Sequence, residues 1–267
     1  MRRIEPNTMS QSNDHRLQNE ARFQDSKMQR TLEGEQEFRD RFYFINKEAF
    51  AKYDSFLQGL AGRRVLVVGS SDGGVTPLAR QKVYVDGIDI SPVSIDKLNS
   101  AIAKEGLTEY ANARVMNAEA LDYPDASIDV ISCSGVLHHL DTEKALRSWA
   151  RCLKDDGSVI LFEPLALHPI AAVFRLFTPS LRTPDEHPLR SRDFKLMRKY
   201  FRSAEVHYYG LTTVVCAGLA LMPGARHLSG NLLPGFESLD RWLMRVMPFT
   251  RHFCWLSVAR LRLPQRT

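Results

Sequence analysis

Short apolar segments alternate with helix-forming segments between residues 64 and 164, and this alternation constrains the fold more than any other feature. The first segment, RVLVVG at 64–69, is rich in β-branched residues and stops at a glycine, which is typical of a buried strand. Strands that alternate with helices form right-handed βαβ units, and hence a parallel sheet covered on both faces. The pattern predicts strands at 64–69, 83–88, 114–116, 128–132 and 158–162, and helices from the first strand to about 81, at 92–104 and at 141–153.

The segments that flank this α/β region have a different character. Residues 1–31 are polar and lack hydrophobic periodicity, so we expect them to be disordered or loosely helical. Apolar residues recur at three- and four-residue steps between 32 and 62, which predicts an N-terminal helical lid. The main domain then spans 63–267, with two apolar and basic insertions at 165–189 and 211–250. Around them we expect a helix at 192–201 and strands at 204–209 and 253–261.

Composition and charge narrow the class of protein. Of the 267 residues, 44% are hydrophobic and 25% charged, as in an ordinary soluble globular protein. From Pro164 onwards there are 15 lysines and arginines against 6 aspartates and glutamates. This basic C-terminal portion indicates either an anionic partner or simply a soluble basic surface.

The cysteines and the uncharged segments indicate whether the protein binds a metal and where in the cell it is located. The 4 cysteines stand far apart, without paired-histidine spacing, so we expect no metal site, no disulfide framework and a reducing compartment. We find no secretory signal, and glycine and proline interrupt the longest uncharged run, at 208–225. We therefore predict a cytoplasmic protein without a transmembrane segment.

The carboxyl ends of the strands are the expected ligand site, because open α/β sheets bind ligands there. The turn from Gly69 to Gly74 follows the first strand, and its glycines permit a sharp turn and close approach of a ligand. Asp89 ends the second strand, where its carboxylate can accept both hydroxyls of an adenosine ribose or instead cap the next helix. The Asn117-Ala-Glu segment and Ser134 follow the third and fourth strands and face the same crevice.

Together these motifs resemble the class I S-adenosylmethionine-dependent methyltransferases, and in particular the group typified by ubiquinone/menaquinone-biosynthesis methylases. The resemblance covers 64–164 and rests on VLVVGSSDG at 65–73, GIDIS at 87–91, NAE at 117–119, DASID at 125–129, VLHHL at 136–140, RCLKDDG at 151–157 and FEP at 162–164. It implies a Rossmann-like sheet of seven strands, whose last strand is antiparallel and inserted between the fifth and sixth. It also implies S-adenosylmethionine as cofactor, with contacts from Tyr43, Gly69, Ser70, Ser71, Gly73, Asp89, Ile90, Asn117, Ala118, Glu119 and Ser134.

The sequence departs from the family pattern at three positions. Val67 stands where the family usually has an acidic residue, Ser71 where it has glycine, and Asn117 where an aspartate faces the adenine. A nicotinamide-dependent oxidoreductase is the alternative for the same crevice, because Gly69-x-Ser71-x-x-Gly74 is a degenerate dinucleotide-binding motif. A protein that binds S-adenosylmethionine without turnover is the second alternative.

Methyl transfer from a sulfonium requires an aligned acceptor and, for a hydroxyl acceptor, a general base. His138 and His139 are the first candidates because they follow the fourth strand at the crevice. Glu163 ends the fifth strand, where it can act on the substrate or cap a helix. His187, in the proline-rich segment 182–189, is a further candidate base, since such loops in compact domains are usually functional.

The two insertions predict the kind of acceptor. Their apolar stretches can wall a hydrophobic pocket, or rest on an anionic membrane with Arg241, Arg245 and Arg251 at the headgroups. We expect a bulky hydrophobic or lipid-linked acceptor, methylated at oxygen or carbon. A small-molecule acceptor, with these segments in the core, is the alternative. No nucleic-acid partner is expected, because the basic and aromatic residues do not form an RNA-binding module.

Overall fold

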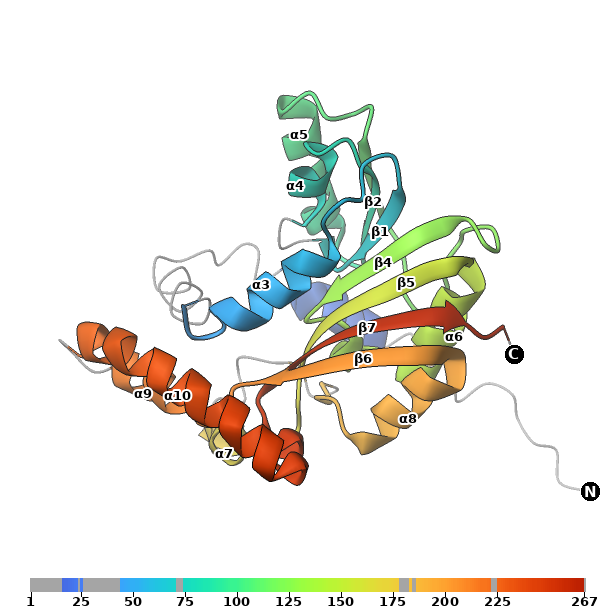
Figure 1. Cartoon of the computed structure of the whole chain (residues 1–267). Coiled ribbons are helices and arrows are strands. Elements are labelled where there is room, and N and C mark those ends of the chain that lie inside the picture. The colour runs from blue at the N-terminus through green and yellow to red at the C-terminus, as the bar shows by residue number, and fades with distance from the viewer. Residues whose placement is uncertain are drawn as a thin grey trace, which may run out of the picture.

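The computed structural model describes residues 16–23, 25, 44–70, 74–177, 183, 186–221 and 225–266. At its centre is a seven-stranded sheet with the order β3-β2-β1-β4-β5-β7-β6 (Figure 1). The first five strands run parallel, whereas β7 is antiparallel to both β5 and β6. The seven-stranded topology that the family resemblance implies is therefore confirmed. The strands are β1 (Arg64–Val68), β2 (Tyr84–Asp89), β3 (Ala111–Val115), β4 (Ile128–Ser134), β5 (Leu153–Pro164), β6 (Phe201–Tyr209) and β7 (Leu256–Pro264).

Helices cover both faces of the sheet, as the alternating pattern predicts. Successive side chains of β1 point to opposite faces, so Val65 and Val67 join one buried cluster and Leu66 and Val68 the other. The first cluster includes residues of α3 (Lys47–Phe56), α4 (Val75–Ala79) and α5 (Pro92–Lys104). The second includes residues of α6 (Thr142–Cys152) and α8 (Ser191–Tyr200). Trp149 of α6 is fully buried there.

The bounds of the expected strands differ in the structure, as β3, β5 and β7 illustrate. The strand expected at 114–116 is β3 at Ala111–Val115, and its first residues lack the β-branched character that would reveal them. β5 begins at Leu153 rather than 158, because Leu153 pairs with Ile128 across a register shift. The final strand begins at Leu256, since the preceding Pro248–Phe253 forms the 3₁₀ helix η4.

The part of the predicted helical lid that is described packs against the sheet. Phe50 of α3 stacks on Phe162 of β5 with ring centroids 4.5 Å apart. The buried hydroxyls of Tyr53 and Ser132 are hydrogen-bonded at 2.5 Å. Residues 26–43, which hold the rest of the lid and Tyr43, lie outside the described residues, and 16–23 are helical.

Both insertions contain helices. The first contains α7 (Pro169–Phe177), and the second contains α9 (Val214–Leu221) and α10 (Arg226–Val246), which lie beyond the end of β6 (Figure 1). Asp240 of α10 anchors the chain after β6, because its carboxylate accepts hydrogen bonds from the backbone N–H groups of Leu211 at 3.0 Å and Thr212 at 2.7 Å. Among the described residues, no helix combines the length and the apolar character needed to cross a bilayer.

Candidate functional site

The turn after β1 marks the point where the strand order reverses, because β1 pairs with both β2 and β4. Gly69 has a φ of +73°, and its N–H donates to the carbonyl of Ile88 at 2.9 Å. A Cβ at this position would lie only 2.1 Å from a methyl group of Val136, in the loop after β4. The turns after β1 and β4 are therefore in direct contact beside the expected cofactor crevice. Ser71 and Gly73 lie outside the described residues.

Asp89 ends β2 beside this turn and is buried. One oxygen of its carboxylate accepts a hydrogen bond from the N–H of Ser91 at 2.9 Å. The side chain of Ser91, not that of Asp89, caps α5 by accepting from the N–H of Ser94 at 3.0 Å. Ser91 therefore provides the helix cap that Asp89 was alternatively expected to provide. The next residue, Ile90, is half-buried at the rim.

The segment after β3 is held by its own hydrogen bonds. The side-chain oxygen of Asn117 accepts from the N–H of Glu119 at 2.9 Å, and the carbonyl of Ala118 accepts from the indole of Trp149 at 2.9 Å. Glu119 is buried; its carboxylate accepts from the N–H of Asp141 at 2.9 Å and pairs with Arg16. These contacts fix the loop at the edge where an adenine is expected.

Glu163, at the end of β5, is completely buried. One carboxylate oxygen accepts from the N–H groups of Val136 at 3.0 Å and Leu137 at 2.8 Å, at the start of the 3₁₀ helix η2 (Leu137–His139). The other lies 2.7 Å from Nδ1 of His138. Burial, together with the negative charge of Glu163, raises the pKa of the Cys133 thiol beside it. This arrangement favours the capping interpretation of Glu163 and makes it a positioning residue for His138.

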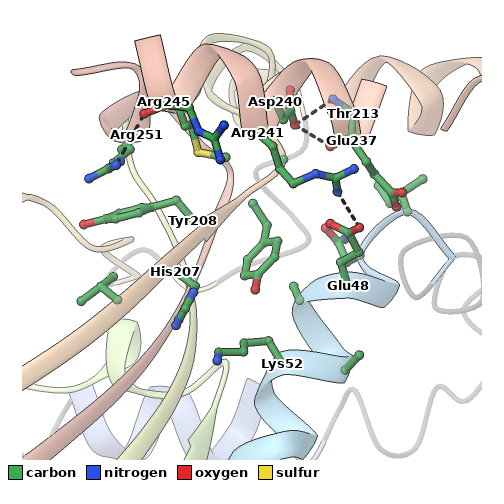
Figure 2. A pocket seen from close by; sticks show the side chains of 18 of the residues that line it. Glu48, Lys52, His207, Tyr208, Thr213, Glu237, Asp240, Arg241, Arg245 and Arg251 are labelled. Atoms are coloured by element: carbon green, nitrogen blue, oxygen red, sulfur yellow. Dashed lines mark hydrogen bonds and ion pairs between the residues drawn. The ribbon is translucent and has the colours of Figure 1, made fainter. Parts of the chain in front are cut away.

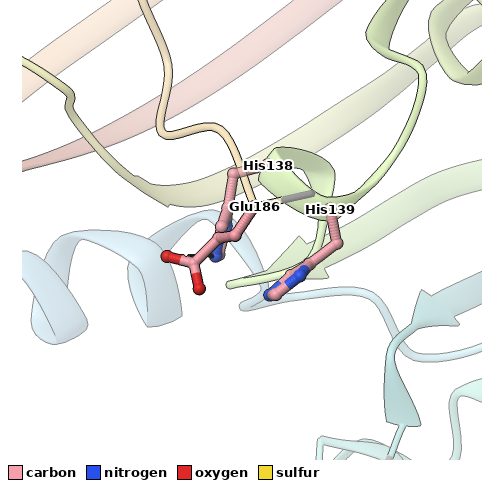
Figure 3. A group of neighbouring side chains, drawn as sticks. All are labelled: His138, His139 and Glu186. Carbon is pink, nitrogen blue, oxygen red and sulfur yellow. Dashed lines mark ion pairs between the residues drawn. The ribbon is translucent and has the colours of Figure 1, made fainter. Parts of the chain in front are cut away.

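His138 and His139 lie side by side with Glu186, which comes from the first insertion (Figure 3). Nε2 of His138 is 3.9 Å from Oε1 of Glu186, and the two imidazole centroids are 4.2 Å apart. Burial lowers the pKa of His139, but the carboxylates of Glu20 and Glu186 outweigh it, and the pKa is raised overall. The structure thus places both histidines in a negative environment.

His187 reaches the same place through its backbone. Its N–H donates to the carbonyl of His138 at 2.8 Å, and the neighbouring Leu189 forms a β-bridge with Leu165. The segment that ends the first insertion is therefore docked on η2. The four predicted catalytic residues lie in one cluster, and the catalytic role of the His187 side chain remains a prediction.

A cavity of about 940 Å³, separate from the turns after β1 and β4, lies between α3, β6 and α10 (Figure 2). Arg241 of α10 reaches Glu48 of α3 across it, with an N–O distance of 2.8 Å. Charged side chains, including Lys52, Arg245 and Arg251, line much of this cavity. Its lining is mixed rather than purely hydrophobic, and none of the predicted cofactor or catalytic residues that the structure describes lines it.

Comparison with known proteins relates the region around the carboxyl ends of the strands to a known protein family. Residues 66–161 match the family described as "Methyltransferase domain". Residues 66–161 therefore form a methyltransferase domain. A ubiquinone/menaquinone biosynthesis C-methyltransferase of Pseudoalteromonas translucida is 33% identical over 111 residues, which cover 38% of this chain and 43% of that protein. A phosphatidylethanolamine N-methyltransferase of Cereibacter sphaeroides is 30% identical over 115 residues, which cover 42% of this chain and 57% of the relative.

The solved structures agree on the fold of this methyltransferase domain. Geranyl diphosphate C-methyltransferase from Streptomyces coelicolor superposes with a TM-score of 0.55 at 13% identity, covering 81% of this chain and 79% of that one. The chain spans about half the length of the curated relatives that it matches.

Sequence reasoning about the methyltransferase domain missed three residues at the site. Glu186 lies in a segment singled out for its histidine, and Arg16 and Glu20 lie in the segment expected to be disordered or loosely helical. Arg16 donates to the carbonyl of His139 at 2.6 Å, and Glu20 lies 3.4 Å from His139 Nδ1. No local pattern marks these residues, because each contact joins segments far apart in the sequence.

Proposed function

We propose that this chain transfers a methyl group from S-adenosylmethionine to an oxygen, or alternatively a carbon, of a bulky hydrophobic or lipid-like acceptor. The observation that carries the proposal is the position of Asp89. Its carboxylate ends β2 next to the Gly69 turn, while Ser91 provides the cap of α5. A carboxylate at this place in an open α/β sheet recognises the two hydroxyls of a ribose.

The residues around Asp89 fit such a cofactor. Ser70 Oγ is buried at the turn and has no hydrogen-bond partner among the described residues, which suits a polar ligand group. Gly69 and Ser70 would hold the amino-acid portion, Asp89 the ribose, and Asn117 and Ala118 the adenine. Val67, which replaces the usual acidic residue, packs in the core and supplies no polar contact.

When bound, S-adenosylmethionine supplies an activated methyl group, and the protein aligns the acceptor and excludes water. Glu163 Oε2 holds a proton on Nδ1 of His138, so Nε2 is the atom that can accept the proton of a hydroxyl acceptor. The acceptor oxygen would take the methyl group, and the electron pair of the sulfur–methyl bond would stay on the sulfur of the cofactor. Glu163 keeps the imidazole in place throughout.

Binding of the demethylated product separates the proposed function from the oxidoreductase alternative. We expect S-adenosylhomocysteine, but not NAD⁺, to raise the thermal unfolding midpoint, because only a ligand of the native state stabilises it. A radiolabelled methyl-transfer assay on a lipid extract then tests turnover. Stabilisation by NAD⁺ alone would reverse the assignment, and product binding without any labelled acceptor would favour a binding protein without turnover.

The lipid-like acceptor is supported by an exposed apolar face on α10, here called the α10 face and made of Leu228, Leu232, Leu239, Trp242 and Val246. These residues recur at three-, four- and seven-residue steps and so lie on one side of the helix. The Cereibacter relative is named for a phospholipid acceptor. Arg241, Arg245 and Arg251 line the cavity on the other side of α10, and Arg241 pairs with Glu48. We propose that the α10 face rests on an anionic membrane surface.

Vesicle co-sedimentation tests this contact. The Trp242→Ser variant should bind anionic vesicles about tenfold more weakly at low salt, because the insertion of an exposed aromatic residue into the interface is lost. Leu263→Ser, which removes an equally exposed apolar residue from the end of β7, is the matched control and should bind like the unmodified protein. Equal binding by both variants would contradict the α10 face as the membrane contact.

A further inference from the structure

The cluster of His138, His139 and Glu186 brings three metal-binding groups together (Figure 3). One ligand atom from each residue lies within 4.8 Å of the others. His138 is buried, and the other two side chains are half-buried. Two imidazoles and one carboxylate form a donor set that proteins use to bind divalent transition metals.

The hydrogen bond between Glu163 and His138 orients the first ligand. Glu163 accepts from Nδ1 at 2.7 Å, so the proton is on Nδ1 and the lone pair of Nε2 is available. That lone pair lies 3.9 Å from Oε1 of Glu186, which is too far for a direct hydrogen bond. A buried carboxylate that holds the far nitrogen of a histidine is the usual outer support of a histidine–metal bond.

His139 supplies the second, independent observation. Its Nδ1 is buried and makes no hydrogen bond with any described residue. Oε2 of Glu20 lies 3.4 Å away and can serve as a fourth ligand or balance the charge of an ion. Arg175 donates to Glu186 at 2.8 Å and holds that carboxylate at the cluster.

We propose that His138 Nε2, His139 Nδ1 and Glu186 bind a divalent transition-metal ion such as Zn²⁺. Ligand atoms of a zinc site lie about 3–3.5 Å apart, given bond lengths of about 2.0–2.2 Å. The cluster therefore has to contract slightly, and Glu186 lies in the loop that would move. The signal is hidden in the sequence because Glu186 is far from the histidines and only the docking of the first insertion on η2 brings it there.

A metal ion at this position would change the catalytic role of His138. This consequence rests on the proposed methyltransferase function. The ion would occupy the Nε2 lone pair, so His138 would act as a ligand and no longer as the base. The Lewis acidity of the ion would lower the pKa of an acceptor hydroxyl, whose proton then passes to solvent before the oxygen attacks the methyl group. The acceptor class would accordingly be one with an ionisable hydroxyl.

Isothermal titration of untagged protein with Zn²⁺, and Co²⁺ absorption as an independent readout, test the site. We expect one ion per chain, with a dissociation constant at least tenfold higher in Glu186→Gln and about 10–100-fold higher in Glu163→Gln. Glu205→Gln is the matched control, because Glu205 pairs with His207 at 2.7 Å on β6 outside the cluster. It should bind Zn²⁺ like the unmodified protein.

The outcomes separate this proposal from the proposed function. Circular dichroism checks that each variant folds, and Glu186→Gln changes the charge of one half-buried side chain while keeping its size. Failure of the unmodified protein to bind Zn²⁺, or equal affinity in Glu186→Gln, would overturn the metal site. If S-adenosylhomocysteine still bound in that case, the methyltransferase assignment would stand. Zn²⁺ binding without S-adenosylhomocysteine binding would support the metal site and contradict the proposed function.

Discussion

Replacement of Asp89 by asparagine is expected to weaken the binding of S-adenosylhomocysteine by about 100-fold. A carboxylate that accepts two ribose hydroxyls makes two charge-assisted hydrogen bonds, each worth about 1.5–3 kcal/mol, and an amide keeps at most one of them in the same geometry. The fold should survive, because the N-cap of α5 comes from Ser91. Isothermal titration calorimetry gives the affinity and urea unfolding gives the stability.

Asp86→Asn provides the matched control for this experiment. Asp86 lies on the same strand, β2, but its carboxylate pairs with Arg64 at 3.0 Å away from the carboxyl edge. Because it is a surface ion pair, its loss should change stability by no more than about 1 kcal/mol and leave the affinity unchanged. Equal affinities for the Asp89 and Asp86 variants would contradict the assigned ribose contact.

Gly69→Ala is expected to lower the free energy of unfolding by about 3 kcal/mol or more and to abolish detectable cofactor binding. The φ of +73° costs an alanine about 1–2 kcal/mol, and its Cβ would overlap a methyl group of Val136, which forces the turns after β1 and β4 apart. Both turns belong to the proposed cofactor site. Urea unfolding and calorimetry measure the two effects.

Gly62→Ala distinguishes these two causes. Gly62 has a similar φ of +74°, but nothing lies within 4 Å of the position of a Cβ there. The free energy of unfolding of this variant should fall only by the backbone cost of about 1–2 kcal/mol, and the variant should bind the cofactor normally. Adding Val136→Ala to Gly69→Ala should recover part of the stability. If Gly62→Ala and Gly69→Ala were equally unstable, close packing of the two turns would not be the reason for the glycine.

The central sheet and the cofactor edge could be predicted from sequence because local patterns specify them. The run that ends at Gly69 and the aspartate that ends β2 each combine strand periodicity with a turn residue, and together they define the switch point of the sheet. The antiparallel position of β7 required the family resemblance, since strand periodicity alone does not give the pairing partner. The sequence did not predict that β3 begins at Ala111, because the residues next to Ala111 are not β-branched.

The cluster around η2 was predicted only in part, for a different physical reason. The sequence places Glu163 at the end of a strand but does not reveal whether its carboxylate faces solvent or the N–H groups of Val136 and Leu137. Glu20 and Glu186 reach the histidines only through tertiary packing. Such contacts between distant segments leave no local periodicity to read.

The position of β7 between β5 and β6 sets the order in which the molecule can assemble during synthesis. Among the described strands β6 pairs with β7, so β6 has no partner in the sheet until residues 256–264 have left the ribosome. The strands up to β5 can pair earlier, because each neighbour has already been made. Until β7 is made, the edge of β5 is exposed, and unpaired strand edges of this kind promote aggregation. A nascent chain arrested before residue 256 should therefore depend on chaperones more than one arrested after 264.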